Sequence, residues 1–480
     1  MYHGSKPRSA PWLGVGALIY VLAFAVTAYG EDLRLLEAVK TRNVRAVQAL
    51  LMEVDVNAAS PDGATALLWA AQWDDVPTAD LLLLAGANVN ASNDYGVTPL
   101  FFAALNGSTA MTERLLRAQG NPNAVLLSGE TLLMTAARTG KTSVVSALLT
   151  AGANINTRTT LMGQTALMWA LSERHLPVAQ LLIEHGADLQ ARSASGFGPL
   201  LFAVRQGDLE AVKMLIAHGA DLHETAANGI GVLHMAVIRG HLALAEFLLA
   251  QGVDPNADEA GYTPLHWAAG TWETATTRDY GVREWQTLVG QRGADKVRLI
   301  TALLAHGANP NARAKKSPPR FGSTAWKIHG GGSPAGATPL FFAAAAADLQ
   351  VIQLLIANGA DPLLATDDKT TPLLAAAGLG VEESETGIPE SAHLEVVQFL
   401  ASVGADIRSP NTLGNTPLHA AAFLGYDSVA RFLLERNVPL NTKNQAGQTP
   451  YKIASGIMVT MMFFQHSSTA DLLREAGGIE

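Results

Sequence analysis

The feature that most constrains this chain is a short segment that returns about every 33 residues along most of its length. At Gly261–Ala269 the segment reads GYTPLHWAA, and close relatives of it occur throughout. Aligned on the threonine, six consecutive spacings are 33, 33, 34, 33, 33 and 32 residues. A fixed period of this length is typical of proteins built from stacked structural repeats. The aligned positions are Thr65, Thr98, Thr131, Thr165, Gly198, Gly231, Thr263, Thr338, Thr371, Thr416 and Thr449.

Each copy of the segment has the marks of a helix start. In pairs such as Thr98-Pro99, the hydroxyl can cap free N–H groups, and proline at the first helical position needs no partner. The residue five places after the aligned position is always alanine, which lets neighbouring helices approach closely. Glycine stands two places before it in ten of eleven copies, with Lys369 as the exception. Such a glycine suits a turn with positive φ.

The second half of each unit predicts a leucine-rich helix that ends at glycine, as in LLLLAGANVN at 81–90 and FLLAQGVDPN at 247–256. A glycine-containing turn, a TPLH helix, a second helix and this ending together resemble the ankyrin repeat. The resemblance covers roughly 31–480 and implies an all-α solenoid of about twelve helix–turn–helix units with short β-hairpin fingers. It also implies a scaffold for protein–protein interaction and no enzyme.

The first 30 residues differ from the repeats. Lys6 and Arg8 precede an uncharged, mostly apolar run from Trp12 to Ala28, and small residues follow. This order is typical of a secretory signal peptide, so we expect an exported protein, periplasmic or secreted and of bacterial type. The alternative is an uncleaved membrane anchor, because the run approaches a membrane-spanning length. A membrane partner is expected only in that case.

The charge balance argues against nucleic-acid binding. Without Lys6 and Arg8 the chain keeps 31 basic and 42 acidic residues, a net charge of 31 − 42 = −11. The chain contains no cysteine, which excludes disulfides, thiolate metal sites and a cysteine nucleophile. We expect a monomer that holds its fold by packing.

Three departures from the period predict insertions, near 271–294, 314–332 and 381–392. The first and third fall between the two helices of a unit, and the second falls in a finger. Insertions are tolerated in loops because the helix faces are committed to their neighbours.

No motif in the sequence predicts catalysis, a cofactor or a metal. Nine of the thirteen histidines stand at places that the repeat explains, three of them in the TPLH position. The repeats occupy nearly all of 31–480, and the insertions are too short to form an enzyme domain. We therefore expect no catalytic, cofactor-binding or metal-binding residues.

Apolar residues at positions that usually contact partners predict a binding stripe. In the family these positions are the finger tips and the exposed side of the first helix, and they are usually polar when idle. The alternative is packing between fingers within the solenoid. The residues are Trp73, Tyr95, Leu127, Met162, Phe197, Ile230 and Tyr262.

The finger insertion suggests a second way of binding. Between Asn311 and Ala337 it carries five basic residues, no acidic residue, and interleaved aromatic rings. Such a basic loop could hold an anionic polymer or a lipid headgroup, as in an accessory protein of the cell envelope. The alternative is a soluble flap. The basic residues, within 313–327, are Arg313, Lys315, Lys316, Arg320 and Lys327.

Overall fold

A computed structural model describes residues 33–270, 293–316, 335–379, 388–459 and 462–480. The described chain contains 24 helices, which pair in sequence order into twelve helix–turn–helix repeats. They divide into two compact units, an N-terminal unit up to Ala187 and a C-terminal unit from Asp188. The predicted all-α architecture of about twelve repeats is confirmed.

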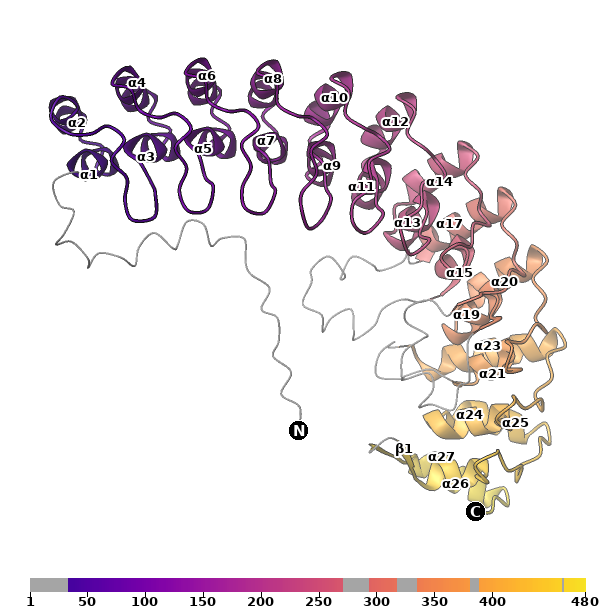
Figure 1. Cartoon of the computed structure of the whole chain (residues 1–480). Coiled ribbons are helices and arrows are strands. Elements are labelled where there is room, and N and C mark those ends of the chain that lie inside the picture. Colours follow the sequence, from indigo (N-terminus) through magenta and orange to yellow (C-terminus); the bar gives the residue numbers. More distant parts are fainter. Residues whose placement is uncertain (1–32, 271–292, 317–334, 380–387, 460–461) are drawn as a thin grey trace. The chain divides into compact units, whose positions relative to one another are not determined.

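The N-terminal unit holds five repeats, whose first and second helices form two layers (Figure 1). The first helices lie side by side in one layer, and the second helices form the other. The first helices are α1 (Arg34–Lys40), α3 (Ala66–Gln72), α5 (Pro99–Asn106), α7 (Leu132–Thr139) and α9 (Ala166–Ser172). The second helices are α2 (Val44–Leu50), α4 (Val76–Leu84), α6 (Thr109–Arg117), α8 (Thr142–Thr150) and α10 (Leu176–Glu184).

The C-terminal unit holds seven repeats and, within its described residues, one two-stranded sheet. Its first helices are α11 (Pro199–Gln206), α13 (Val232–Ile238), α15 (Pro264–Ala269), α19 (Pro339–Ala345), α21 (Pro372–Ala376), α24 (Pro417–Leu424) and α26 (Pro450–Ser455). Its second helices are α12 (Leu209–Ala217), α14 (Leu242–Ala250), α17 (Gly293–Ala305), α20 (Leu349–Ala357), α23 (Glu390–Ser402), α25 (Asp427–Leu434) and α27 (Ser467–Glu475). Strands β1 (Ile457–Val459) and β2 (Met462–Phe464) pair antiparallel between α26 and α27.

The threonine of the repeat caps the first helix, as the sequence predicts. The Thr98 hydroxyl accepts a hydrogen bond from the Phe101 amide at 3.3 Å, and Thr371 accepts one from Leu374 at 3.1 Å. In the TPLH repeats, the histidine ring takes part as well. His266 Nδ1 accepts from the Thr263 amide at 3.1 Å, so the cap is tied to the first turn of α15.

The alanine of each repeat lies in the core between first helices. Ala70, Ala136 and Ala376 are fully buried, together with the apolar anchor residues such as Leu67 and Leu133. Because a methyl group takes little space, adjacent first helices can pack at close distance. This packing fixes the stacking direction of the repeats within each unit.

We call the turn before each first helix a finger. Its glycine has positive φ, for example 77° at Gly96 and 81° at Gly196. Lys369, the one departure in sequence, adopts φ 63° and so makes the same turn. The fingers are less regular than the predicted β-hairpins. Three of them close through a single antiparallel bridge, at Ala59–Thr65, Val125–Thr131 and Thr225–Gly231.

Asparagine side chains link successive repeats beside the second-helix ends. Asn123 Nδ2 donates to the Gly152 carbonyl at 3.0 Å, and its Oδ1 accepts from the Asn154 amide at 2.7 Å. Asn90 makes the same pair of bonds to the Gln119 carbonyl and the Asn121 amide, at 3.1 and 2.7 Å. Each side-chain amide therefore holds the next repeat in register through two hydrogen bonds, and we call such a link an asparagine rung.

The insertions fall mostly on residues that the structure leaves undescribed, namely 271–292, 317–334 and 380–387. Their described edges add helix. Helices α17 and α23 each have 13 residues, whereas α14 and α20 have nine. The last residues of the ranges expected near 271–294 and 381–392 therefore belong to the second helix, which begins at Gly293 in α17 and at Glu390 in α23.

Candidate partner-binding surface

The finger tips of the N-terminal unit carry large exposed apolar side chains. The exposed fraction is 62% for Tyr95, 80% for Leu127, 81% for Leu161 and 56% for Met162. These four residues, which we call the finger ridge, come from three consecutive fingers. Exposed apolar side chains are unfavourable in water, and here they stand on neighbouring repeats, which makes the finger ridge the candidate contact surface.

The fingers of the C-terminal unit differ in their tip residues. Ser195, Asn228 and Asp367 occupy tip positions there, and Leu413, 37% exposed, is an apolar exception. In the N-terminal unit the Asp94 amide donates to the Asp62 carbonyl at 2.9 Å, so adjacent fingers are joined through their backbones. The finger that carries Tyr95 is therefore held by the finger before it.

The structure separates the seven predicted stripe residues. Tyr95, Leu127 and Met162 lie on the finger ridge, and Trp73, 42% exposed, ends α3. Phe197 and Ile230 are half-buried. They stand one place before the cap, and Phe197 contacts Phe202 of α11, with 6.0 Å between the ring centroids.

The prediction for Tyr262 is wrong. Only 4% of this side chain is exposed, and its ring stacks on Trp267 at 6.0 Å between centroids. The His234 and Tyr262 rings form an edge-to-face pair with their centroids 5.9 Å apart. Burial raises the pKa of Tyr262 to about 12. Tyr262 is a core residue that fixes the end of its finger.

Leu161 is a ridge residue that our sequence reasoning missed. The finger from Thr159 to Gly163 closes with the Gly163 amide donating to the Thr159 carbonyl at 3.0 Å. It contains one residue more than its neighbours, so two apolar side chains, Leu161 and Met162, stand at its tip. The 34-residue spacing between Thr131 and Thr165 was the available signal.

Cations lie over indole rings on the first helices of the N-terminal unit. Lys40 Nζ is 4.9 Å from the centre of the Trp69 ring, and the Arg42 guanidinium is 5.0 Å from the Trp73 ring. The two indole centroids are 6.2 Å apart. These pairs add an aromatic and cationic area to the same unit as the finger ridge.

The described part of the basic loop is largely neutralised. Arg313 pairs with Asp367 at 3.0 Å and Lys315 pairs with Asp258 at 2.7 Å. Both carboxylates come from neighbouring repeats, which is why inspection of the loop alone showed no acidic partner. The Lys316 amide donates to the Gly261 carbonyl at 3.0 Å. Arg320 and Lys327 lie outside the described residues.

The TPLH histidines are structural where the structure describes them. His266 Nε2–H donates to the carbonyls of Ala312 and Ala337, at 3.0 and 3.1 Å, and His419 Nε2–H donates to Gln448 at 3.1 Å. Within the described ranges no three His, Asp or Glu side chains gather as a metal site. The imidazoles therefore join one repeat to the next.

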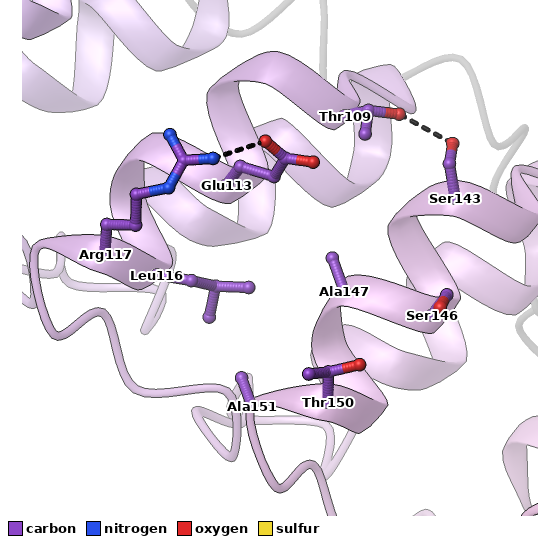
Figure 2. Close-up of a pocket in the computed structure, with 9 residues that line it drawn as sticks. All are labelled: Thr109, Glu113, Leu116, Arg117, Ser143, Ser146, Ala147, Thr150 and Ala151. Atoms are coloured by element: carbon purple, nitrogen blue, oxygen red, sulfur yellow. Dashed lines mark hydrogen bonds and ion pairs between the residues drawn. The ribbon is translucent and has the colours of Figure 1, made fainter.

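Helices α6 and α8 border an open groove on the second-helix layer (Figure 2). Its two charged lining residues, Glu113 and Arg117, pair with each other at 2.7 Å. The hydroxyls of Thr109 and Ser143 are hydrogen-bonded at 2.6 Å. The groove is therefore lined mainly by small side chains, and its two charged residues pair with each other.

The comparison with known families agrees with this architecture. A family model described as ankyrin repeats (3 copies) matches residues 35–125, 102–193, 200–275 and 388–472. A model of the single ankyrin repeat matches 335–368. No curated protein matches the chain. The matched ranges cover well over half of the sequence, and the chain belongs to the ankyrin-repeat family.

Ankyrin repeats are protein-interaction modules, so the class of this protein is a protein–protein interaction scaffold. Among the helices that the structure describes, none is both long and apolar enough to cross a membrane. The segment 1–30, for which we expect a signal peptide, lies outside those residues.

Proposed function

We propose that this protein is an exported, non-enzymatic scaffold that binds an extended segment of a partner protein along the finger ridge. The observation that carries the proposal is the exposure of Tyr95, Leu127, Leu161 and Met162 on consecutive fingers. Aromatic and large apolar side chains dominate the binding energy of protein interfaces. Their regular placement gives the partner a line of contacts.

The spacing of the ridge favours an extended partner segment. Repeats stack at about 10 Å, the usual distance between packed helices. Three residues of an extended chain span about 10 Å. Such a segment would present one apolar side chain to each finger if those side chains recur at every third position. The cation–indole area on α1 and α3 would adjoin this contact.

The test of the ridge uses a photo-crosslinking amino acid at position 127, with position 84 as the matched control. Leu84 is 87% exposed but ends the second helix α4, away from the fingers. Crosslinking in the native cell should trap a specific protein from position 127 and leave position 84 unlinked. Mass spectrometry then identifies the trapped protein.

The triple substitution Tyr95→Ser, Leu127→Ser and Met162→Ser should weaken binding of that protein at least tenfold, because each lost anchor contributes of the order of 1–2 kcal/mol. Circular dichroism should remain unchanged, since these side chains are exposed. Leu84→Ser serves as the control and should bind normally. Undiminished binding by the folded triple variant would rule out the ridge as the contact surface.

Export is proposed from the order of charge, apolar run and small residues in 1–30. We expect the mature protein to begin at Tyr29 or Glu31. Intact-mass and N-terminal peptide analysis of the protein from its native cell measures this directly. A full-length chain recovered from the membrane fraction would instead support the uncleaved anchor.

A further inference from the structure

The pair formed by Arg42 and Trp73 has the features of a carboxylate-binding site. The guanidinium lies 5.0 Å from the centre of the indole, a contact that limits the movement of the side chain. Arg42 is exposed, and Trp73 is the most exposed of the four described tryptophans. In the described part of the chain, no carboxylate lies within ion-pair distance of Arg42.

Among the described residues, Arg42 differs from the other cations that lie over indole rings in having no carboxylate partner. Lys40 lies over Trp69 but pairs with Glu37 at 2.9 Å. Arg138 lies over Trp169 at 5.4 Å and also approaches Glu130, at 3.6 Å. Each of these two cations therefore has an internal carboxylate. Arg42 is stacked in the same way, but its five N–H donors have no anionic acceptor.

Arg42 stands in the turn that follows the first helix of its repeat, where the backbone is left-handed. Its φ is 54°, and at the same place after a first helix the other repeats of the unit have Asp74, Gly107, Gly140 and Arg174, all with positive φ. The conformation brings the guanidinium onto the Trp73 ring of the next repeat.

We propose that Arg42, seated on Trp73, binds an acidic side chain of the partner's extended segment, while the finger ridge takes its apolar side chains. This inference rests on the proposed function and adds a specificity for acidic sequences. The helix α3, which Trp73 ends, packs beside α5, whose finger carries Tyr95. The exposed carboxylate of Asp74, next to Trp73, repels an acidic ligand. The charge-assisted hydrogen bonds from the Arg42 guanidinium have to be stronger than this repulsion.

The probe is a phage-displayed library of random twelve-residue peptides, selected on the full-length protein. Enriched peptides should combine apolar residues at three-residue spacing with an aspartate or glutamate. For a selected peptide, replacing that acid by its amide should reduce affinity about tenfold on the wild-type protein, since a charge-assisted bond is lost. The same replacement should have little effect on the Arg42→Asn protein, because asparagine tolerates left-handed φ but lacks the cation.

Two controls define the result. Arg174→Asn removes another exposed arginine with left-handed φ, 60°, and should keep the acidic preference. Asp74→Asn should strengthen binding of the acidic peptide. A selection without acidic preference, or equal loss on wild-type and Arg42→Asn proteins, overturns this inference and leaves the ridge proposal intact. If the selected peptides bind equally well to the Tyr95→Ser, Leu127→Ser and Met162→Ser variant, both this inference and the ridge proposal are overturned. Arg42-dependent binding of polygalacturonate without peptide binding would identify an anionic polymer and overturn the inference.

Discussion

Lowering the pH from neutral to about 4 is expected to destabilise the C-terminal unit strongly, by about 3 kcal/mol for each of His266 and His419. Both imidazoles are buried, and burial lowers the pKa of each to about 4 from an ordinary value of 6.5. Burial also lowers the pKa of His234 and His393, in the same unit.

The direction of the effect follows from proton uptake. In the folded protein these imidazoles stay neutral down to about pH 4, whereas in the unfolded chain they take up a proton below about pH 6.5. Their contribution to stability is therefore complete above pH 6.5 and is lost as the pH falls toward 4. Protonation would also remove the acceptor at His266 Nδ1 that receives the Thr263 amide.

Urea unfolding followed by circular dichroism over this pH range gives the free energy of unfolding. Hydrogen exchange of α15 and α24 locates the change. The double variant His266→Gln and His419→Gln should lose stability at neutral pH but show a flatter pH dependence. The control His185→Gln and His218→Gln alters exposed rings that bond to their own helices and should leave the slope unchanged. An unaltered slope in the buried-site variant would refute the assignment.

The same substitution, glycine to threonine, should have opposite effects at Gly231 and Gly198. Both glycines take the place of the capping threonine and have its extended backbone, with φ of −89° and −93°. At Gly231 an added Cβ would meet its nearest neighbours at 3.7 Å, an ordinary contact. The threonine could cap α13 and donate to His234 Nδ1, which is buried and has no partner. We expect a gain of about 1 kcal/mol.

At Gly198 the cap is already supplied by Glu224. This carboxylate is buried, and its Oε1 accepts from the Gly198 amide at 2.6 Å and more weakly from Leu201 at 3.4 Å. Burial raises the pKa of Glu224, against the opposing effect of Arg192. An added Cβ would overlap the Arg192 guanidinium and lie 2.7 Å from Glu224 Oε1.

We therefore expect Gly198→Thr to lose about 2–4 kcal/mol, the usual result of disturbing a buried charge pair. Thermal and urea unfolding of the two single variants, compared with the wild-type protein, measures both signs in one experiment. If both variants lose stability equally, the distinction between the two caps does not hold.

The sequence predicted the repeat architecture because its signals are local. A threonine cap, an alanine five places on and a glycine in the turn act within one unit, so a period of 33 residues was enough to place the helices. Lys369, the exception to the glycine pattern in the sequence, nevertheless has the positive φ of the turn.

The features that escaped prediction depend on residues from different repeats. Nothing local at Gly198 indicates that Glu224, 26 residues later, would cap its helix. The charges of Arg313 and Lys315 looked unbalanced because Asp367 and Asp258 belong to other fingers. Tyr95 was placed correctly on the exposed surface, but Tyr262 was not. Tyr95 stands three residues before its cap, at the finger tip, whereas Tyr262 stands one residue before its cap, where the side chain is already in the core.

The asparagine rungs give each unit a particular response to mechanical force. A rung such as Asn123 joins only its own repeat to the next one, through two hydrogen bonds. If the stack within the N-terminal unit is pulled along its length, every interface between repeats bears the same force. One interface can then separate while the others remain closed. An extended partner attached to several fingers would add links in parallel with the rungs and share that load. A partner bound along the ridge would then make the stack of repeats harder to separate under tension.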